Sequence, residues 1–340
     1  MSLESLESYN SDLSSSPEAT YTVNNIRELA AGVCFAVTGT VLPDCSRFEV
    51  NLILNNSDVA LHVNPRFSPN YISYNSLNVN RGWENEENCS LIEFNLKRGK
   101  QFILHILVTN EAFLICVNGR HCHEFWHRRP YWKICSLEVK GDVRKVAVEQ
   151  CYIENYPLQP VKFVPRRTPE VQSRIKEKRL STDNKQKLQA EQMPYTGLLE
   201  LPFTNGQKLH IIGRLNTEPN RFHVNLQTSA YVWPHPNILF HLNPRFEGER
   251  VIVCNSWRNG WAHEERSEIP RDIQPGTPFY LRIDCTVVGY KVILNGKRIL
   301  EFVFRDNPRL VNAVHVQGDI TLYDIAIEKA LTARIGYGES

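Results

Sequence analysis

The chain has 340 residues, 42% of them hydrophobic, and its 39 Lys and Arg residues nearly balance its 37 Asp and Glu residues. This near-neutral charge argues against a dedicated nucleic-acid-binding protein, and no apolar run is long enough to span a bilayer. The composition is that of a folded protein, and the length suits two average domains.

The N-terminal residues, 1–25, are rich in Ser and acidic residues and predict a disordered tail. They carry neither a basic leader nor an apolar block, so no secretory signal peptide is expected. The cysteine count is odd, and the two halves of the chain do not share cysteine positions, which predicts free thiols in a reducing compartment. The nine cysteines are Cys34, Cys45, Cys89, Cys116, Cys122, Cys135, Cys151, Cys254 and Cys285.

From Val33 to about Tyr152, apolar and polar residues alternate in short segments such as 48–52 and 102–106. Alternation interrupted by Gly, Asn and Pro predicts antiparallel strands with one buried face. Asn118-Gly119 lies between two such segments and predicts a tight hairpin turn.

The second half repeats this order. Asn295-Gly296 corresponds to Asn118-Gly119, and the segment 314–320 corresponds to 137–143. A duplicated order of strands predicts an all-β chain with two antiparallel β-sandwich domains. The expected division is a tail at 1–25, a first domain at 26–155, a linker at 156–193, a second domain at 194–330 and a C-terminal tail at 331–340.

The expected linker, 156–193, contains several prolines followed by a basic run. One interpretation is a solvated linker that is extended at its start and helical around 171–180. The alternative is a nuclear-import or acidic-surface patch around 176–179.

A series of polar and aromatic residues occurs once in each half. In the second half strand alternation places His241, Asn243 and Arg245 on one face. The Asn259-Gly260 turn then predicts a further strand that carries Trp261, Glu264 and Arg266. The full series is His241, Asn243, Arg245, Asn255, Trp261, Glu264 and Arg266 in the second half and His62, Asn64, Arg66, Asn75, Trp83 and Glu86 in the first, where Asn88 replaces the last Arg.

Such a set suits a neutral sugar. Buried sugar hydroxyls need matched hydrogen-bond partners, which Asn and Arg supply as fixed planar groups, and an indole can cover the C–H face of the ring. A carboxylate between two Arg side chains stays ionised and accepts from hydroxyls.

The His-x-Asn-Pro-Arg, Asn, Trp-x-x-Glu-x-Arg series resembles the carbohydrate-recognition signature of galectins, and the likeness covers both halves. The resemblance implies a jelly-roll-like, concanavalin-like β-sandwich in each half. It implies β-galactoside binding with no cofactor and no metal, and cytoplasmic synthesis followed by non-classical secretion to the extracellular space.

The resemblance also implies a role for each matching residue. It implies that His241, Asn243 and Arg245 bind the axial 4-hydroxyl and ring oxygen of galactose, and that Asn255 and Glu264 bind the 6-hydroxyl. It further implies that Trp261 stacks on the ring face and that Arg266, with Arg245 and Glu264, reaches the neighbouring sugar. In the first half, Asn88 removes a charge-assisted contact and leaves Glu86 with one Arg partner fewer. We therefore expect that half to bind galactosides more weakly or with an altered preference.

Two pairs on the strand before each motif, Arg47 with Glu49 and Arg221 with His223, are candidates for an extended subsite. They fit an ordinary row of solvent-facing polar residues equally well.

Three other functions rank lower. A zinc site at Cys116, His121, Cys122, His123 and His127 lacks the usual ligand spacing, and the second half has no counterpart. A glycosidase needs a carboxyl that can act as an acid, which Glu264 between two Arg residues does not provide. The third is an intracellular protein-interaction protein that uses the sandwich against cytosolic partners.

The sequence thus predicts a bivalent lectin without catalysis that cross-links β-galactosides on glycoproteins or glycolipids. It predicts no nucleic-acid partner and no membrane insertion, and the basic patch leaves a nuclear fraction open.

Overall fold

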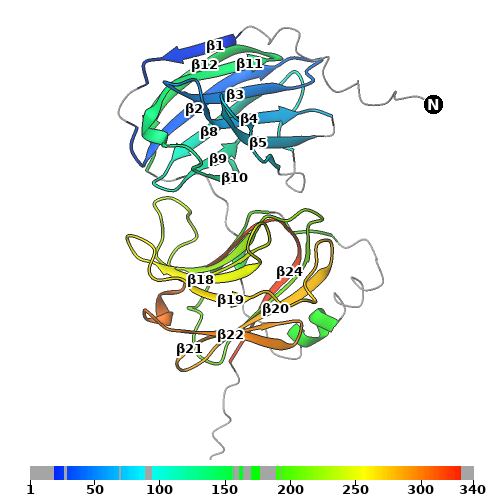
Figure 1. Ribbon diagram of the computed structural model, residues 1–340. Coiled ribbons are helices and arrows are strands. Elements are labelled where there is room, and N and C mark those ends of the chain that lie inside the picture. Colours follow the sequence, from blue (N-terminus) through cyan, green and yellow to red (C-terminus); the bar gives the residue numbers. More distant parts are fainter. Residues whose placement is uncertain are drawn as a thin grey trace, which may run out of the picture. The chain divides into compact units, whose positions relative to one another are not determined.

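The chain divides into two compact units, residues 1–153 and 154–340 (Figure 1). Residues 1–18 and 331–340 of the expected tails lie outside the described residues, as do Cys89 and most of the basic run at 177–188. The expected N-terminal tail is wrong at residues 19–24, which form a strand paired with residues 136–140. In the described part of the chain, no helix is long and apolar enough to cross a membrane. The computed structural model describes residues 19–26, 29–68, 70–88, 94–154, 156, 161–163, 170–176, 189–191 and 193–330.

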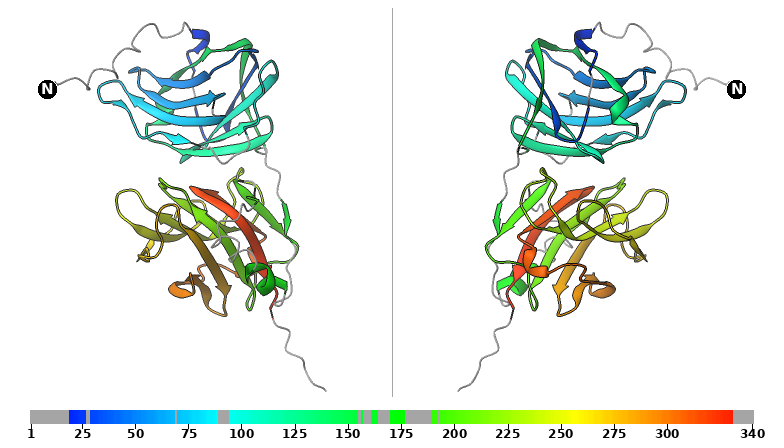
Figure 2. Two further views of the ribbon diagram at one scale, coloured as in Figure 1. Left: turned by 90° about the vertical axis from the view of Figure 1, so that its right-hand side faces the viewer. Right: turned by 90° about the vertical axis from the view of Figure 1, so that its left-hand side faces the viewer.

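The first unit, which we call domain 1, consists of two antiparallel sheets that form a sandwich (Figure 2). The seven-stranded sheet has the order β1-β11-β3-β4-β5-β6, with β7 also paired to β5, and the five-stranded sheet has the order β10-β9-β8-β2-β12. The first sheet contains β1 (Ala19–Asn24), β3 (Phe48–Leu54), β4 (Val59–Arg66), β5 (Tyr71–Asn78), β6 (Gly82–Trp83), β7 (Glu87–Asn88) and β11 (Ile134–Gly141). The second contains β2 (Val33–Val41), β8 (Gln101–Val108), β9 (Ala112–Val117), β10 (Arg120–Trp126) and β12 (Val143–Tyr152), and a short 3-10 helix spans Tyr131–Lys133.

The second unit, domain 2, repeats this topology. Its seven-stranded sheet has the order β13-β14-β23-β16-β17-β18-β19, and its five-stranded sheet has the order β22-β21-β20-β15-β24. The first sheet contains β13 (Val161–Phe163), β14 (Tyr195–Leu199), β16 (Phe222–Gln227), β17 (Ile238–Arg245), β18 (Val251–Trp257), β19 (Glu265–Glu268) and β23 (Ala313–Gly318). The second contains β15 (Lys208–Leu215), β20 (Pro278–Cys285), β21 (Gly289–Leu294), β22 (Lys297–Val303) and β24 (Ile320–Glu328), and a 3-10 helix spans Pro308–Leu310. The predicted fold, two antiparallel β-sandwiches in an all-β chain, is confirmed.

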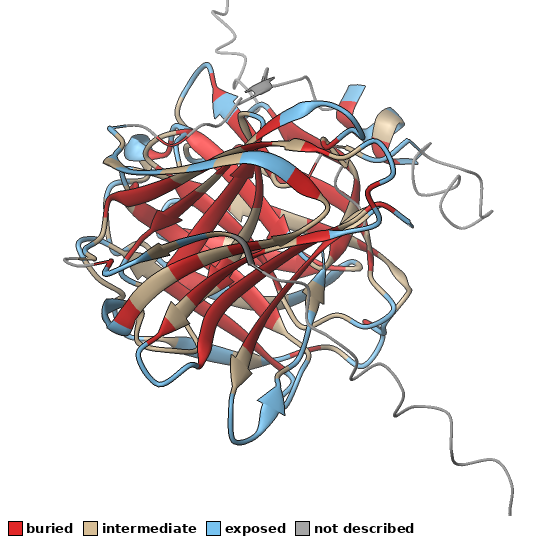
Figure 3. Ribbon diagram, turned by 90° about the horizontal axis from the view of Figure 1, so that it is seen from above, coloured by how far each residue is buried: buried red, intermediate tan, exposed pale blue. Residues whose placement is uncertain are grey.

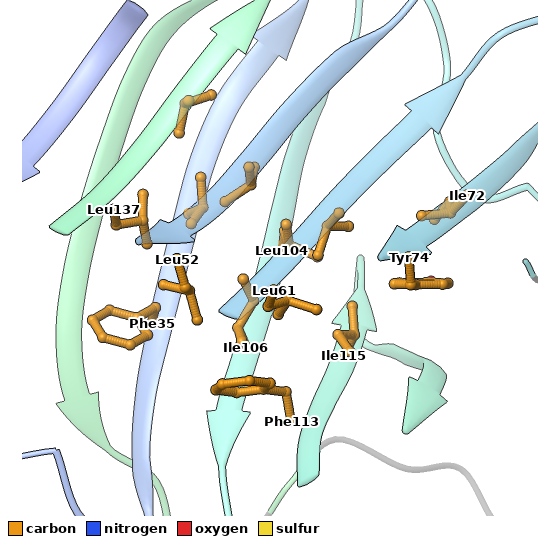
Figure 4. Close-up of a cluster of buried hydrophobic side chains, with 14 of the residues drawn as sticks. Phe35, Leu52, Leu61, Ile72, Tyr74, Leu104, Ile106, Phe113, Ile115 and Leu137 are labelled. Atoms are coloured by element: carbon orange, nitrogen blue, oxygen red, sulfur yellow. The ribbon is translucent and has the colours of Figure 1, made fainter. Parts of the chain in front are cut away.

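The core of domain 1 lies between its two sheets (Figure 4). Leu52 and Leu61 on the seven-stranded sheet and Leu104 and Ile106 on the five-stranded sheet are at most 2% exposed. Along β8 buried residues alternate with more exposed ones over most of the strand, as the sequence predicts for a strand with one buried face. Burial of each such side chain contributes about 1.5–3 kcal/mol. Figure 3 shows the buried strand segments that result.

The predicted hairpin turns are confirmed. Asn118 and Gly119 have φ values of 50° and 79°, and Asn295 and Gly296 have values of 50° and 86°. Both turns connect antiparallel neighbours, β9 with β10 and β21 with β22. Asn and Gly tolerate the left-handed backbone that such a turn requires.

The repeated Gly-Asp pair has a structural role in both domains. A Cβ atom on Gly318 would lie 2.5 Å from the carbonyl oxygen of Arg221, so only glycine fits beside that strand. The neighbouring Asp319 carboxylate accepts hydrogen bonds from the backbone N–H groups of Asn220 and Arg221, at 2.9 and 3.0 Å. Asp142 accepts the same two bonds in domain 1. This pair therefore fixes the start of the strand before the polar motif.

Several residues of the expected linker pack on domain 2. Residues 170–176 form a helix whose Val171 and Ile175 are 0% and 5% exposed and pack against Ile212 and Ala326. Arg174 of this helix binds the buried carboxylate of Asp324 through several hydrogen bonds. β13 adds a parallel strand to β14. The helix is packed rather than solvated, because it has an apolar stripe at i, i+4 spacing.

Eight cysteines lie in the described residues, and all eight are free thiols. Six of them are buried, and Cys135 and Cys151 are partly exposed. Burial raises the pKa of the Cys34 and Cys116 thiols to about 12, which keeps these groups protonated and unreactive.

Candidate functional site

The polar triad of each motif lies on a central strand of the seven-stranded sheet. His241, Asn243 and Arg245 lie on β17, and His62, Asn64 and Arg66 lie on β4. Because alternate residues of a strand point to one face, each triad shares one face of its sheet. The histidine and asparagine side chains are buried and the arginines are partly exposed, so hydrogen bonds within the protein fix the orientation of the buried groups.

The histidine of each motif is neutral and held in one tautomer. His241 Nδ1 lies 2.6 Å from Asn225 Oδ1, and His62 Nδ1 lies 2.6 Å from Asn51 Oδ1. Burial, with the charges of Arg245 and Arg221, lowers the pKa of His241 to about 3. Burial and the neighbouring Arg66 and Arg47 lower the pKa of His62 to about 4. Since Nδ1–H donates to the amide oxygen, Nε2 is left as an acceptor for a hydroxyl group.

The asparagine of each triad links the backbone to the arginine. Asn243 donates from Nδ2 to the Phe222 carbonyl at 2.7 Å and accepts from Arg245 Nε at 2.8 Å. In domain 1, Asn64 donates to the Phe48 carbonyl at 2.9 Å and accepts from Arg66 Nε at 2.8 Å. Both guanidinium groups are thus held by an amide that the strand itself fixes.

The carboxylate beside the arginine is paired differently in the two domains. In domain 2, Glu264 lies 3.5 Å from Arg245 and 2.9 Å from Arg266. Arg266 also binds Glu249 at 2.8 Å. Glu264 is therefore shared between two guanidiniums, as the sequence predicted.

In domain 1, and among the residues that the structure describes, Glu86 pairs with Arg66, with N–O distances of 2.8 and 3.3 Å. The hydroxyl of Tyr71 accepts a further hydrogen bond from Arg66. Asn88, which replaces the second arginine, is exposed on β7. Glu86 thus keeps a bidentate partner, and Arg66 donates hydrogen bonds to Asn64, Tyr71 and Glu86.

The tryptophan of each motif lies against the histidine. The ring centroids of His241 and Trp261 are 4.7 Å apart, and those of His62 and Trp83 are also 4.7 Å apart. The predicted strand over 261–266 is wrong in its start, because β19 begins at Glu265. Trp261 and Glu264 precede it, and Trp261 forms only an isolated bridge with Trp257. The Ala262 carbonyl accepts a hydrogen bond from Asn255 Nδ2 at 2.9 Å.

Two arginines that the sequence analysis did not identify brace the site. Arg305 donates to Asn255 Oδ1 at 3.0 Å and binds Glu265 at 2.8 Å, and its guanidinium lies 4.5 Å from the Phe302 ring centroid. In domain 1, Arg128 donates to Asn75 Oδ1 at 3.4 Å and binds Glu87 at 2.6 Å. The repeated Phe-x-x-Arg spacing was the signal in the sequence that could have found them.

The acidic loop of domain 1 is neutralised internally. Glu84 accepts hydrogen bonds from Ser76 Oγ and Arg129, and Glu87 binds His123 and Arg128 at 2.8 and 2.6 Å. Burial alone would raise the pKa of Glu87. The hydrogen bonds and charges of His123 and Arg128 outweigh this effect and lower the pKa to about 2. The carboxylates of Glu84 and Glu87 thus have cationic partners within the protein.

The candidate extended subsites lie beside the two histidines. Glu49 Oε2 is 3.4 Å from His62 Nδ1 in domain 1. In domain 2 the ring of His223 is 5.5 Å from that of His241 and 5.6 Å from that of His315. Arg47 and Arg221 form isolated bridges with Arg66 and Arg245. The corresponding position therefore carries a carboxylate in one domain and an imidazole in the other.

Two of the Cys and His residues considered for zinc have other environments in the structure. Cys116 is buried, and His123 binds Glu87. Among the residues that the structure describes, no group of three or more His, Cys, Asp or Glu side chains could hold a metal ion.

Each site therefore offers a neutral imidazole acceptor, a fixed guanidinium, an ion-paired carboxylate and an indole. These groups can bind hydroxyls and cover an apolar ring face.

Comparison with known proteins agrees with this chemistry. The family model for galactoside-binding lectins matches residues 20–149 and 194–327. The chain is similar to galectin-6 of Mus musculus, with 30% identity over 302 residues that cover 86% of this chain and 90% of the relative. It is also similar to galectin-4 of Homo sapiens, with 29% identity over 307 residues, 88% of this chain and 92% of the relative. A third relative is the 32 kDa beta-galactoside-binding lectin of Caenorhabditis elegans, with 28% identity over 302 residues, 87% of this chain and 92% of that lectin.

Proposed function

This chain belongs to the galectins, the galactoside-binding lectin family, and we propose that each domain binds a β-galactoside through the polar triad, carboxylate and tryptophan described above. The protein is a bivalent β-galactoside-binding lectin. The observation that carries the assignment of the residues is the frame that both domains share. In each, an amide holds the histidine as a neutral acceptor, and a second amide ties the arginine to the strand.

The axial 4-hydroxyl of galactose donates to Nε2 of the histidine and accepts from the arginine. Asn255 and Glu264 in domain 2, or Asn75 and Glu86 in domain 1, bind the 6-hydroxyl, and the indole covers the ring. In glucose the 4-hydroxyl is equatorial, and the buried imidazole and the partly exposed guanidinium would lose their partner. A site built around a hydroxyl rejects a ligand that misplaces it, because buried polar groups are then left unpaired.

Domain 2 is the stronger site, and domain 1 is weaker or has an altered preference for the second sugar. Arg266 supplies domain 2 with a guanidinium at the second sugar, where domain 1 has the shorter, uncharged Asn88. Arg66 is occupied by Asn64, Tyr71 and Glu86, which leaves fewer N–H groups for a ligand.

The protein acts by cross-linking glycoconjugates and has no catalytic activity. Glu264 and Glu86 are ion-paired to arginine, and a paired carboxylate is a poor general acid. Two weak sites on one chain gain apparent affinity when both engage one glycan-bearing surface. We place its synthesis in the cytoplasm, consistent with its free thiols, and its glycan targets outside the cell.

Affinity chromatography of the full chain on immobilised lactose tests this function. Free lactose should elute the protein, whereas cellobiose, which presents glucose in place of galactose, should not. Elution by both sugars, or no retention, would contradict the proposal. Failure of lactose to release a bound glycoprotein would instead favour protein-mediated binding.

A further inference from the structure

The two domains differ most in the loop that precedes the motif strand. In domain 1 residues 55–58 connect β3 to β4, whereas in domain 2 residues 228–237 connect β16 to β17. The longer loop carries Tyr231, Trp233 and His235. Tyr156 braces it, because its backbone N–H donates to the Trp233 carbonyl at 3.2 Å and its side chain is 1% exposed.

A tryptophan that the motif does not include lies next to this loop. Trp257 is two residues beyond Asn255 on β18, so both side chains point to the face that holds the sugar site. Asn255 pairs with His241, and Trp257 pairs with Ile238 at one end of β17, whereas Arg245 lies at the other end. Trp257 therefore flanks the galactose position on the side away from Arg245 and the second sugar.

The rings of His235, Trp257 and Trp261 form a continuous series, which we call the aromatic shelf. Trp257 and Trp261 have centroids 5.4 Å apart with nearly perpendicular planes, and His235 and Trp257 have centroids 4.4 Å apart. Trp257 is partly exposed, and Tyr231 at the loop tip is 46% exposed. The shelf is uncharged, because burial lowers the pKa of His235 below its usual value.

Domain 1 lacks the shelf. Leu77 occupies the place of Trp257 and pairs with Trp83, and Trp83 is 53% exposed. The His62–Trp83 contact is the same as in domain 2, so the difference lies beyond the galactose position.

We propose that the aromatic shelf is an additional subsite of domain 2, which binds a neutral pyranose with an apolar face, such as a 6-deoxyhexose, attached to galactose. The proposal rests on the proposed function. If the motif holds the 4- and 6-hydroxyls and the second sugar is linked at carbon 1, the 2- and 3-hydroxyls are the ones free to carry a substituent. A neutral, apolar-faced group matches uncharged rings, because stacking on indole removes C–H surface from water.

The test uses the full chain carrying Trp83→Ala, so that titrations report domain 2. The probes are lactose, 2′-fucosyllactose and 3′-galactosyllactose, which carry no substituent, a 6-deoxyhexose on the 2-hydroxyl and a neutral hexose on the 3-hydroxyl. We expect at least one substituted sugar to bind about three- to tenfold more tightly than lactose, the range that one aromatic contact provides.

Trp257→Leu, which installs the residue of domain 1, should abolish this preference and change lactose affinity much less. Trp257→Phe keeps a ring and should retain part of the preference, with thermal unfolding as the folding control. No preference for either substituted sugar, or a preference unchanged in Trp257→Leu, would overturn the subsite. If the chain that carries only Trp83→Ala does not bind lactose, the proposed function itself is overturned.

Discussion

The two domains share a frame and differ around it. The histidine–asparagine contact is 2.6 Å in both, and the histidine–tryptophan ring separation is 4.7 Å in both. The second arginine, the surroundings of the indole and the loop before the motif strand all differ. Bonds within the frame depend on strand register and tolerate little change, whereas the periphery lies on short strands and loops that can vary at low cost. We therefore propose that the shared frame selects galactose and that the differing residues around it set the affinity and the preference for further sugars.

The largest expected difference between the domains is the loss of stability at acidic pH. In domain 2, burial lowers the pKa of His210 and His315 to about 4 and that of His241 to about 3. In domain 1, burial lowers the pKa of His62 to about 4 and also lowers the pKa of His105 and His127. Between pH 6.5 and about 4 the unfolded chain binds protons that the folded chain excludes, so stability falls as pH falls. Domain 2 should lose more of its free energy of unfolding than domain 1, because the shifts at His210, His241 and His315 each contribute about 1.4 kcal/mol per pKa unit. Urea unfolding of the separated domains from pH 7 to 4.5 measures this, and equal losses would contradict it.

Removal of the frame asparagine should have the next largest effect. Asn243→Ala leaves the Phe222 carbonyl and Arg245 Nε without their partner, which corresponds to about a 100-fold loss of lactose affinity in domain 2. Asn64→Ala should cause a similar proportional loss in domain 1. Calorimetry of both variants tests whether the frames are equivalent, and a large loss in only one domain would show that they are not.

The packed helix at 170–176 should stabilise domain 2. Arg174→Ala leaves the Asp324 carboxylate, 2% exposed, without its cation and should reduce the free energy of unfolding by about 2–3 kcal/mol. Lys176→Ala on the same helix is the control, because Lys176 is exposed and should change stability by less than about 0.5 kcal/mol. Equal effects of the two substitutions would mean that the Arg174–Asp324 ion pair contributes nothing to the stability of the domain.

The smallest effect is expected at the exchanged arginine. Asn88→Arg should raise the lactose affinity of domain 1 about two- to fivefold, and Arg266→Asn should lower that of domain 2 by a similar factor, since both positions are solvent-exposed. Asn88→Gln adds length without charge and serves as the control. An equal gain in lactose affinity from Asn88→Gln and Asn88→Arg would show that the charge of the arginine is not the cause.

Sequence alone predicted the parts of the site that follow from local rules. Alternation placed His241, Asn243 and Arg245 on one face, and Asn-Gly identified the hairpins. It missed the braces of Arg128 and Arg305, because these join residues about 40 to 50 positions apart in the chain. It also placed Trp261 in a strand, since a side-chain bond from Asn255 to the Ala262 carbonyl leaves no local pattern.

The packing of residues 170–176 on domain 2 was also missed. The Val171 and Ile175 stripe was visible, but its partners Ile212 and Ala326 are distant in the sequence. The aromatic shelf depends in the same way on a ring contact between separate elements, His235 in a loop and Trp257 at the end of β18.

The central claim is that both domains bind lactose through the same frame but with different affinities. A calorimetric titration of the full chain with lactose, beside the Trp83→Ala and Trp261→Ala variants, tests it most directly. We predict that Trp261→Ala removes most of the binding and that Trp83→Ala removes a smaller, weaker component. Equal losses in the two variants would contradict the inequality of the domains, and no binding by the unaltered chain would contradict the assignment of the frame to galactosides.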